Sequence, residues 1–221
     1  MVRAEGSRSG WRAGAALRRL AAVGPLALCA LMAAAPCRAA DAAADPHAKH
    51  RAMTARADLS RSLASYAVPA IPLVREDGKR VMLTDELDDG RPVVLDFIYT
   101  TCNGICPLAS QTFARLQKLL GPDTERVHLV SISIDPEQDT PDRLAEYAKQ
   151  FHAASGWDHY TGTVRASLAA QRAFDVYRGD KMSHTPVTLV RVKPGSAWIR
   201  FDGFATADDL LLELGARVAA N

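Results

Sequence analysis

The stretch from Val93 to Pro107 constrains the fold more than any other part of the chain. It reads VVLDFIYTTCNGICP and opens with a run of β-branched and aromatic residues, which is typical of a buried strand. Two cysteines four positions apart, Cys102 and Cys106, follow the strand, and an apolar pattern of helical period then runs to Leu120. The pattern predicts a strand, a tight turn that carries a cysteine pair, and a helix.

The amino-terminal segment carries the positive charge of the chain. Residues 1–39 hold six arginines and one glutamate, a charge of +5, whereas residues 40–221 hold 21 basic and 24 acidic residues, a charge of −3. The arginines precede an uncharged run, and small residues stand at the −3 and −1 positions of a cut before Ala40. We interpret residues 1–39 as a signal peptide, or alternatively as an uncleaved membrane anchor, and residues 40–65 as a flexible tether. The globular part is not basic, which excludes an electrostatic basis for nucleic-acid binding.

The predicted export determines which cysteines remain in the mature chain and whether they meet oxidising conditions. A cut before Ala40 removes Cys29 and Cys37 and leaves Cys102 and Cys106, in a compartment where thiols oxidise. A disulfide that closes so small a loop adds little stability. We therefore expect the pair to serve chemistry, in the periplasm or on the outer face of the inner membrane.

Strands and helices alternate through a domain that we place at residues 66–221. Turn signals at residues 76–78 and 193–195 predict two hairpins, and strand–helix units between them predict parallel pairing through right-handed crossovers. The predicted fold class is α/β, a thioredoxin-like mixed sheet flanked by helices, with an N-terminal β-hairpin. Strands are expected at residues 92–99, 127–134, 186–192 and 198–204, a short extended piece at 156–162, a charged connection at 85–90, and helices at 108–120, 140–151, 164–174 and 207–219.

The cysteine pair suits both soft metals and thiol exchange. Residues i and i+4 share one face of a helix, and a helix N-terminus favours thiolate over thiol. Two thiolates can form a disulfide or bind copper(I), and one imidazole would also let copper(II) be held. His184 is the best candidate for this third ligand, because the loop that enters the strand at Pro186 lies beside the cysteine helix in a thioredoxin-like sheet.

Other polar residues are expected to have structural or solvated roles. His128 begins a buried strand and is interpreted as structural, whereas His152 and His159 are expected to be solvated. A histidine pair in the tether, at positions 47 and 50, is interpreted as part of a solvated tail rather than a metal site. Asp139 is expected to cap the helix that follows it.

The mature domain resembles the Sco/SenC family of copper-handling proteins, which are exported or membrane-anchored and thioredoxin-like. Four stretches carry the resemblance: FIYTTCNGICP (97–107), SISIDPEQDTP (131–141), the SHT around His184, and DGF (202–204). The resemblance implies a copper site of Cys102, Cys106 and His184, with Asp135 as an acidic residue close to it. It also implies a role in assembling the dinuclear copper centre of cytochrome c oxidase. The copper subunit of the oxidase would then receive the copper, and the N-terminus could associate with the membrane.

Two departures from the family's sequence pattern favour thiol–disulfide exchange over copper delivery. The cysteines enclose Asn103-Gly104-Ile105, where many family members carry Pro-Asp, and Thr185-Pro186 resembles the cis-proline of thioredoxins. In this alternative Cys102 attacks a partner's disulfide and Cys106 resolves the mixed disulfide, with thioredoxin-like reductants as further partners. Copper delivery would proceed by ligand exchange without enzymatic turnover. A three-ligand copper site needs His184 and exchange does not, so the histidine favours copper handling.

Overall fold

The apolar run that precedes the cysteines forms the centre of the sheet. The computed structural model describes residues 59–218, and in it all six residues of β4 (Val93–Ile98) are buried. β5 (His128–Ser133) pairs with β4 in parallel and β7 (Val187–Arg191) pairs with it antiparallel. A strand that is covered on both faces must be apolar along its length, as β4 is with the exception of Asp96.

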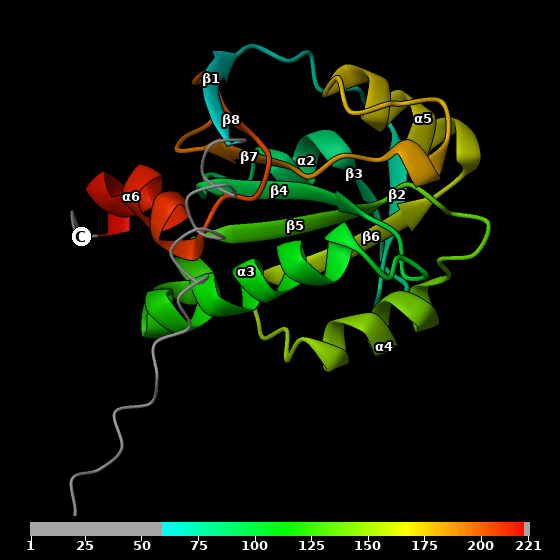
Figure 1. Ribbon diagram of the computed structural model, residues 1–221, viewed down its shortest axis with the longest axis horizontal. Coiled ribbons are helices and arrows are strands. Elements are labelled where there is room, and N and C mark those ends of the chain that lie inside the picture. Colours follow the sequence, from blue (N-terminus) through cyan, green and yellow to red (C-terminus); the bar gives the residue numbers. More distant parts are fainter. Residues whose placement is uncertain (1–58, 219–221) are drawn as a thin grey trace, which may run out of the picture. The chain divides into compact units, whose positions relative to one another are not determined.

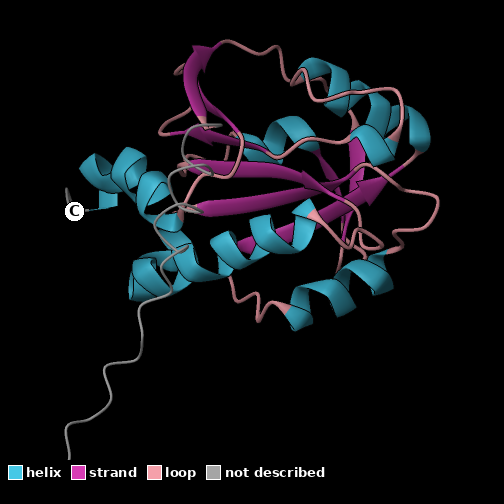
Figure 2. Ribbon diagram, in the orientation of Figure 1, coloured by secondary structure: helices cyan, strands magenta, loops and turns pink. Residues whose placement is uncertain are grey.

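Within the described residues the sheet has eight strands in the order β1-β8-β7-β4-β5-β6-β2-β3 (Figures 1 and 2). The other strands are β1 (Ser60–Ala64), β2 (Pro72–Arg75), β3 (Arg80–Met82), β6 (Trp157–Gly162) and β8 (Trp198–Asp202). The helices are α2 (Leu83–Leu87), α3 (Ile105–Leu120), α4 (Pro141–Gln150), α5 (Val164–Ala173) and α6 (Ala207–Val218), with short 3-10 helices at Gly121–Arg126 and Lys181–Ser183. The expected mixed sheet, flanked by helices and carrying the β2–β3 hairpin, is confirmed.

Two layers of helices cover the sheet. α2 and α5 pack on the face to which Leu95 of β4 points, and α3, α4 and α6 pack on the opposite face (Figure 1). Ile98 and both cysteines belong to a smaller apolar cluster with Leu144 of α4. In space, the turn that carries the cysteines therefore lies between the end of β4 and α4, and apolar side chains of both elements pack against the cysteines.

Helix ends follow capping signals in the sequence. Thr140 caps α4 by accepting a hydrogen bond from the Arg143 N–H. At the start of α6 the Asp209 N–H donates to Thr206 Oγ1 at 3.2 Å, and the Thr206 N–H donates to Asp209 Oδ2 at 2.9 Å. The expected cap of α4 at Asp139 is wrong, because Thr140 fills that position.

The sheet extends beyond the boundaries that the sequence predicts. β1 precedes the expected domain start at Tyr66 and pairs antiparallel with β8, although its side chains are mostly exposed. β6, expected as a short extended piece, is a largely buried strand parallel to β5. α2 extends to Leu87 and so includes the first residues of the segment 85–90, which was expected to be a charged connection. The expected leader at residues 1–39 and the tether histidines lie outside the described residues. Between residues 59 and 218 no helix is long and apolar enough to cross a membrane.

Three histidines differ in their surroundings. His128 is buried at the start of β5, as expected of a residue that begins a buried strand, and His152 is exposed, as expected of a solvated side chain. His159 is buried in β6, so the expectation that it is solvated is wrong. Burial lowers the pKa of His159 to about 4, which keeps the ring neutral.

A row of buried polar side chains crosses the sheet on the face covered by α3 and α4. Asp96, Ser131 and His159 are register partners on β4, β5 and β6, and all three are buried. Trp157 donates its Nε1–H to Ser131 Oγ at 3.0 Å. Neither the Asp96 carboxyl nor the His159 ring makes a hydrogen bond, so both groups are costly to charge.

The substitution Asp96→Asn is expected to remove a pH-dependent loss of stability. Burial raises the pKa of the Asp96 carboxyl from 3.8 to about 7, and the nearby Ser131 hydroxyl offsets this only in part. The folded protein therefore holds this proton more tightly than the unfolded chain, so stability falls as pH rises between these two values. The loss is on the order of a few kcal/mol, at about 1.4 kcal/mol per pKa unit.

Urea unfolding across this pH range measures the effect. The free energy of unfolding of Asp96→Asn, relative to the wild-type protein, should increase as pH rises. Parallel pH profiles for the two proteins would contradict the assignment of the charge cost to Asp96.

Candidate metal centre

The cysteine pair lies where β4 ends and α3 begins. Cys102 is in the turn that follows β4, and Cys106 is the second residue of α3. The Cys102 N–H donates to the Tyr99 carbonyl at 3.1 Å, and the Cys106 N–H donates to Cys102 Sγ with an N···S distance of 3.4 Å. Both cysteines are free thiols, Cys102 being 7% exposed and Cys106 1% exposed. The Cys106 N–H, in the first turn of α3, thus points at the sulfur of Cys102, the more exposed of the two cysteines.

The two thiols are shifted in opposite directions. Burial alone would raise the pKa of Cys102, but hydrogen bonds from Cys106 and from the Gly104 N–H outweigh it. The Tyr99 hydroxyl adds to this effect, and the pKa of Cys102 is lowered from its ordinary value. Burial and the adjacent Cys102 raise the pKa of Cys106. Cys102 is therefore the readier thiolate, and Cys106 keeps its proton until another bond forms at its sulfur.

Asp139 holds the start of the cysteine turn. Its buried carboxylate accepts hydrogen bonds from Thr100 Oγ1 at 2.5 Å, from the Thr100 N–H at 3.2 Å and from Ser133 Oγ at 2.6 Å. Thr100 follows β4 and Ser133 ends β5, so one side chain joins the ends of two parallel strands. This role was not predicted from the sequence, although Asp139 lies in the SIDPEQDTP stretch that carries part of the family resemblance.

Asp135 connects the same loop to the segment that carries His184. Its carboxylate accepts a hydrogen bond from Lys181 Nζ at 2.6 Å, and its side chain is only 10% exposed. Lys181 begins the 3-10 helix that directly precedes His184, and its Nζ lies 5.6 Å from the centroid of the Tyr99 ring. The structure thus places Asp135 where it holds the histidine loop through Lys181.

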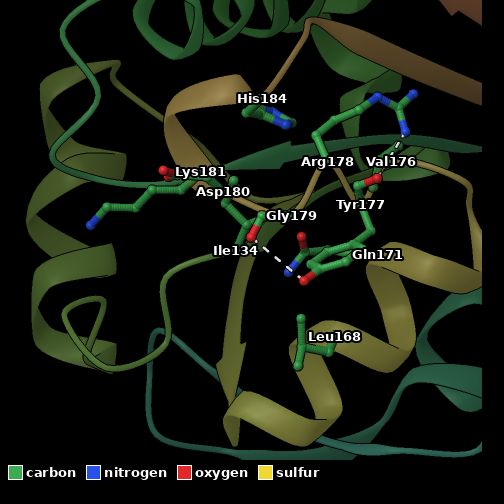
Figure 3. A pocket seen from close by; sticks show the side chains of 10 residues that line it. All are labelled: Ile134, Leu168, Gln171, Val176, Tyr177, Arg178, Gly179, Asp180, Lys181 and His184. Atoms are coloured by element: carbon green, nitrogen blue, oxygen red, sulfur yellow. Dashed lines mark hydrogen bonds between the residues drawn. The ribbon is translucent and has the colours of Figure 1, made fainter.

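His184 reaches the end of β4 from the loop before β7. Its Nε2 lies 2.9 Å from the Phe97 carbonyl oxygen, so the Nε2–H donates there and Nδ1 is left as the ligand atom. Burial lowers the pKa of His184, and the hydrogen bond to Phe97 opposes this only in part, so the ring is neutral. The ring lines a cavity of about 110 Å³ together with Ile134, Arg178 and Lys181 (Figure 3).

The structure brings Cys102 and Cys106 together but does not bring His184 into one cluster with them. Among the described residues, one group of three potential ligands has its ligand atoms all within 4.8 Å of one another, and it lies elsewhere. The cysteine half and the histidine half can therefore hold one ion only if the two loops move closer together.

Tyr99 is a neighbour of the cysteines that the sequence analysis did not identify. Its hydroxyl lies 3.9 Å from Met182 Sδ. Burial, followed by the hydrogen bond to Cys102 and the charge of that residue, raises the pKa of Tyr99 to about 12. Met182 itself is 75% exposed. The resemblance to the cis-proline of thioredoxins does not hold, because none of the described peptide bonds is cis and Thr185-Pro186 is trans.

The substitution Asp139→Ala should destabilise the fold far more than the neighbouring change Asp142→Ala. Removing the carboxylate leaves the buried donors of Thr100 and Ser133 without an acceptor, which should cost at least about 2–3 kcal/mol. Asp142 is an exposed residue of α4, and its loss should cost less than about 0.5 kcal/mol. The free energy of unfolding in urea measures both, and equal losses would show that Asp139 is no anchor.

Comparison with known proteins identifies the family of the chain. The SCO1/SenC family model matches residues 64–210. The SCO1 protein homolog of Bacillus subtilis is 35% identical over 105 residues, which cover 47% of this chain and 53% of the relative. The mitochondrial SCO1 homolog 1 of Arabidopsis thaliana is 40% identical over 139 residues, covering 59% of this chain and 40% of the relative. The chain spans about half the length of these curated relatives.

Solved structures agree with this assignment. Arabidopsis thaliana ScoI with copper bound is 28% identical with a TM-score of 0.55, covering 69% of this chain and 96% of that one. BsSco, a member of the Sco family of cytochrome c oxidase assembly proteins in which a disulfide switch was identified, is 25% identical with a TM-score of 0.59, covering 72% and 98%. A SCO1/SenC family lipoprotein from Bacillus anthracis shares the fold, with a TM-score of 0.61 at 21% identity over 70% and 96%. The fold is thioredoxin-like as expected, and the chain belongs to the SCO1/SenC family.

Proposed function

We propose that this chain binds copper through Cys102, Cys106 and His184 and passes it on for assembly of the dinuclear copper site of cytochrome c oxidase. The observation that carries the proposal is the juxtaposition of a lowered-pKa thiol, in the turn before α3, with a second thiol at the start of that helix and a neutral imidazole on a loop at the end of the same strand. Solved relatives that contain copper support the choice of metal.

The ligand set suits copper(I). Thiolate sulfur is a soft ligand, and the sulfurs of Cys102 and Cys106 can bind one soft cation while the protons of the thiols pass to solvent. The bound cation replaces the proton that Cys106 otherwise keeps because of its raised pKa. His184 would supply the third bond through Nδ1 and would extend the site to copper(II).

Delivery would proceed by ligand exchange without turnover. Thiolates of a receiving protein, such as the copper subunit of the oxidase, replace the ligands of this chain one at a time. We place the protein outside the cytoplasm, in the periplasm or on the outer face of the inner membrane. Residues 1–39 would then act as a signal peptide or as an uncleaved anchor that associates with the membrane. Thioredoxin-like reductants would keep the pair reduced, and Asp135 would hold the histidine loop near the site through Lys181.

Thiol–disulfide exchange is a second candidate, favoured by the opposite pKa shifts of the two thiols. Cys102 thiolate would attack a partner's disulfide and release one partner thiolate. Cys106, after losing its proton, would then attack Cys102 Sγ and release the second, so the partner is reduced and this pair is oxidised. The 1% exposure of Cys106 suits a resolving thiol that meets no partner directly.

An anaerobic titration of copper(I) into the reduced protein, against a competing chelator, tests the three-ligand site. Cys29 and Cys37 are replaced by serine throughout, so that only the two proposed thiols remain. We expect one copper per chain, with affinity reduced about tenfold or more in His184→Ala and in Cys102→Ser. His152→Ala removes an exposed histidine and should leave the affinity unchanged.

Unchanged affinity in His184→Ala would overturn the three-ligand site. Copper binding too weak to compete with the chelator would overturn copper handling and leave thiol–disulfide exchange as the function. The reduction potential of the pair would then be the next quantity to measure.

A further inference from the structure

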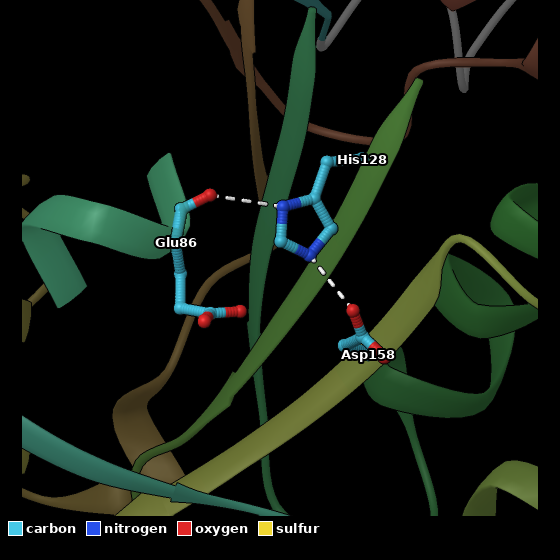
Figure 4. A group of neighbouring side chains, drawn as sticks. All are labelled: Glu86, His128 and Asp158. Atoms are coloured by element: carbon cyan, nitrogen blue, oxygen red, sulfur yellow. Dashed lines mark hydrogen bonds and ion pairs between the residues drawn. The ribbon is translucent and has the colours of Figure 1, made fainter. Parts of the chain in front are cut away.

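Three potential metal ligands converge at the end of the sheet away from the cysteines. Glu86 comes from α2, His128 from the start of β5 and Asp158 from β6, and their ligand atoms all lie within 4.8 Å of one another (Figure 4). His128 Nε2 lies 3.0 Å from Asp158 Oδ2. Tyr160 donates its hydroxyl proton to Glu86 Oε2 at 2.5 Å and lies 3.2 Å from the same Nε2.

This trio is separate from the candidate metal centre. His128 is the register partner of Val93, the first residue of β4, whereas the cysteine turn follows the last residue of that strand. Six residues of strand span about 20 Å. The trio also lies on the face of the sheet covered by α2, whereas the cysteines pack on the face covered by α3 and α4.

Both ring nitrogens of His128 face hydrogen-bond acceptors. Nδ1 faces the Glu86 carbonyl oxygen at 3.0 Å, and Nε2 faces Asp158 Oδ2 at 3.0 Å, so both ring nitrogens meet acceptors. A neutral imidazole carries one N–H and satisfies one of them. Tyr160 cannot serve the other, because its proton is already donated to Glu86. With Nδ1–H donating to the carbonyl, the lone pair of Nε2 faces the Asp158 carboxylate and is available to a metal ion that the carboxylate also binds.

We propose that Glu86, His128 and Asp158 form a binding site for a divalent cation of the zinc class. One imidazole nitrogen and two carboxylate oxygens are ligands that zinc accepts, at about 2.0–2.2 Å. Two ligands at such distances in tetrahedral geometry lie roughly 3.3–3.6 Å apart, so the 3.0 Å between His128 Nε2 and Asp158 Oδ2 would have to open only slightly. The site contains no sulfur, so it does not favour copper(I) and differs in chemistry from the cysteine pair.

The surroundings fit such an ion in charge and in access. The His128 ring is fully buried, whereas the Asp158 side chain is 21% exposed and Glu86 is partly exposed, so an ion can enter from the carboxylate side. Arg75 approaches the other oxygen of Asp158 to 3.9 Å, but it makes its closer hydrogen bonds to Asp77. The hydroxyl of Tyr160 would orient the Glu86 carboxylate toward the ion. The bound ion would join α2 to β5 and β6.

The test is a titration of zinc sulfate into the full-length chain, followed by equilibrium dialysis and by thermal unfolding. The background variant lacks every other strong zinc ligand set: Cys29, Cys37, Cys102 and Cys106 are serine, and His47 and His50 are alanine. We expect one zinc ion per chain and a midpoint of unfolding that rises with zinc concentration. Because the sulfur ligands are absent, the outcome does not depend on the proposed copper function.

Matched amide substitutions assign the ligands. Glu86→Gln and Asp158→Asn keep the side-chain shape and should each weaken zinc binding about tenfold or more. Asp85→Asn changes an exposed carboxylate one residue away on α2 and should leave binding unchanged. Nitrogen NMR should show the His128 Nε2 resonance move on zinc addition while Nδ1 stays protonated. A background variant that binds no zinc, or zinc binding that is unchanged in both Glu86→Gln and Asp158→Asn, would overturn the site.

Discussion

The hydrogen bonds of the buried Asp139 carboxylate determine where the cysteine turn leaves the sheet. Thr100 and Ser133, at the ends of β4 and β5, both donate to it, so the position of the turn is set by a directional polar contact as well as by apolar packing. A carboxylate in a dry interior is stable only when several donors face it, which makes this arrangement specific to one geometry. Cys102 and Cys106 follow Thr100 within a few residues, so the contacts of Asp139 also set the position of the cysteines.

The second acidic residue of the same loop extends this control to the other half of the site. Asp135 holds Lys181, and Lys181 directly precedes the turn that carries His184. Two loops thus hold the two halves of the proposed site, one following β4 and the other bonded to the Phe97 carbonyl of that strand. We expect such a divided site to close around an ion and to open again for ligand exchange. The raised pKa of Cys106 keeps its thiol protonated until an ion arrives.

The sequence predicted the parts of the fold whose signals are local. A buried strand, a cysteine pair and a helix follow one another in Val93–Leu120, and the structure contains them in that order. The sequence did not predict β1. The side chains of β1 are mostly exposed and form no apolar pattern, and its pairing with β8 joins residues far apart in the chain. The burial of His159 likewise depends on α4 covering β6, and the role of Asp139 depends on a contact across 39 positions with Thr100. Such contacts arise from tertiary packing, which residue periodicity does not encode.

The central claim is that two separately held loops close on one copper ion, and X-ray absorption at the copper edge tests it most directly. The protein would be loaded with copper(I), with Cys29 and Cys37 replaced by serine. The account predicts two sulfur ligands and one nitrogen ligand, with the nitrogen lost in His184→Ala and retained in His152→Ala. A sulfur-only shell that is the same in all three proteins would contradict it.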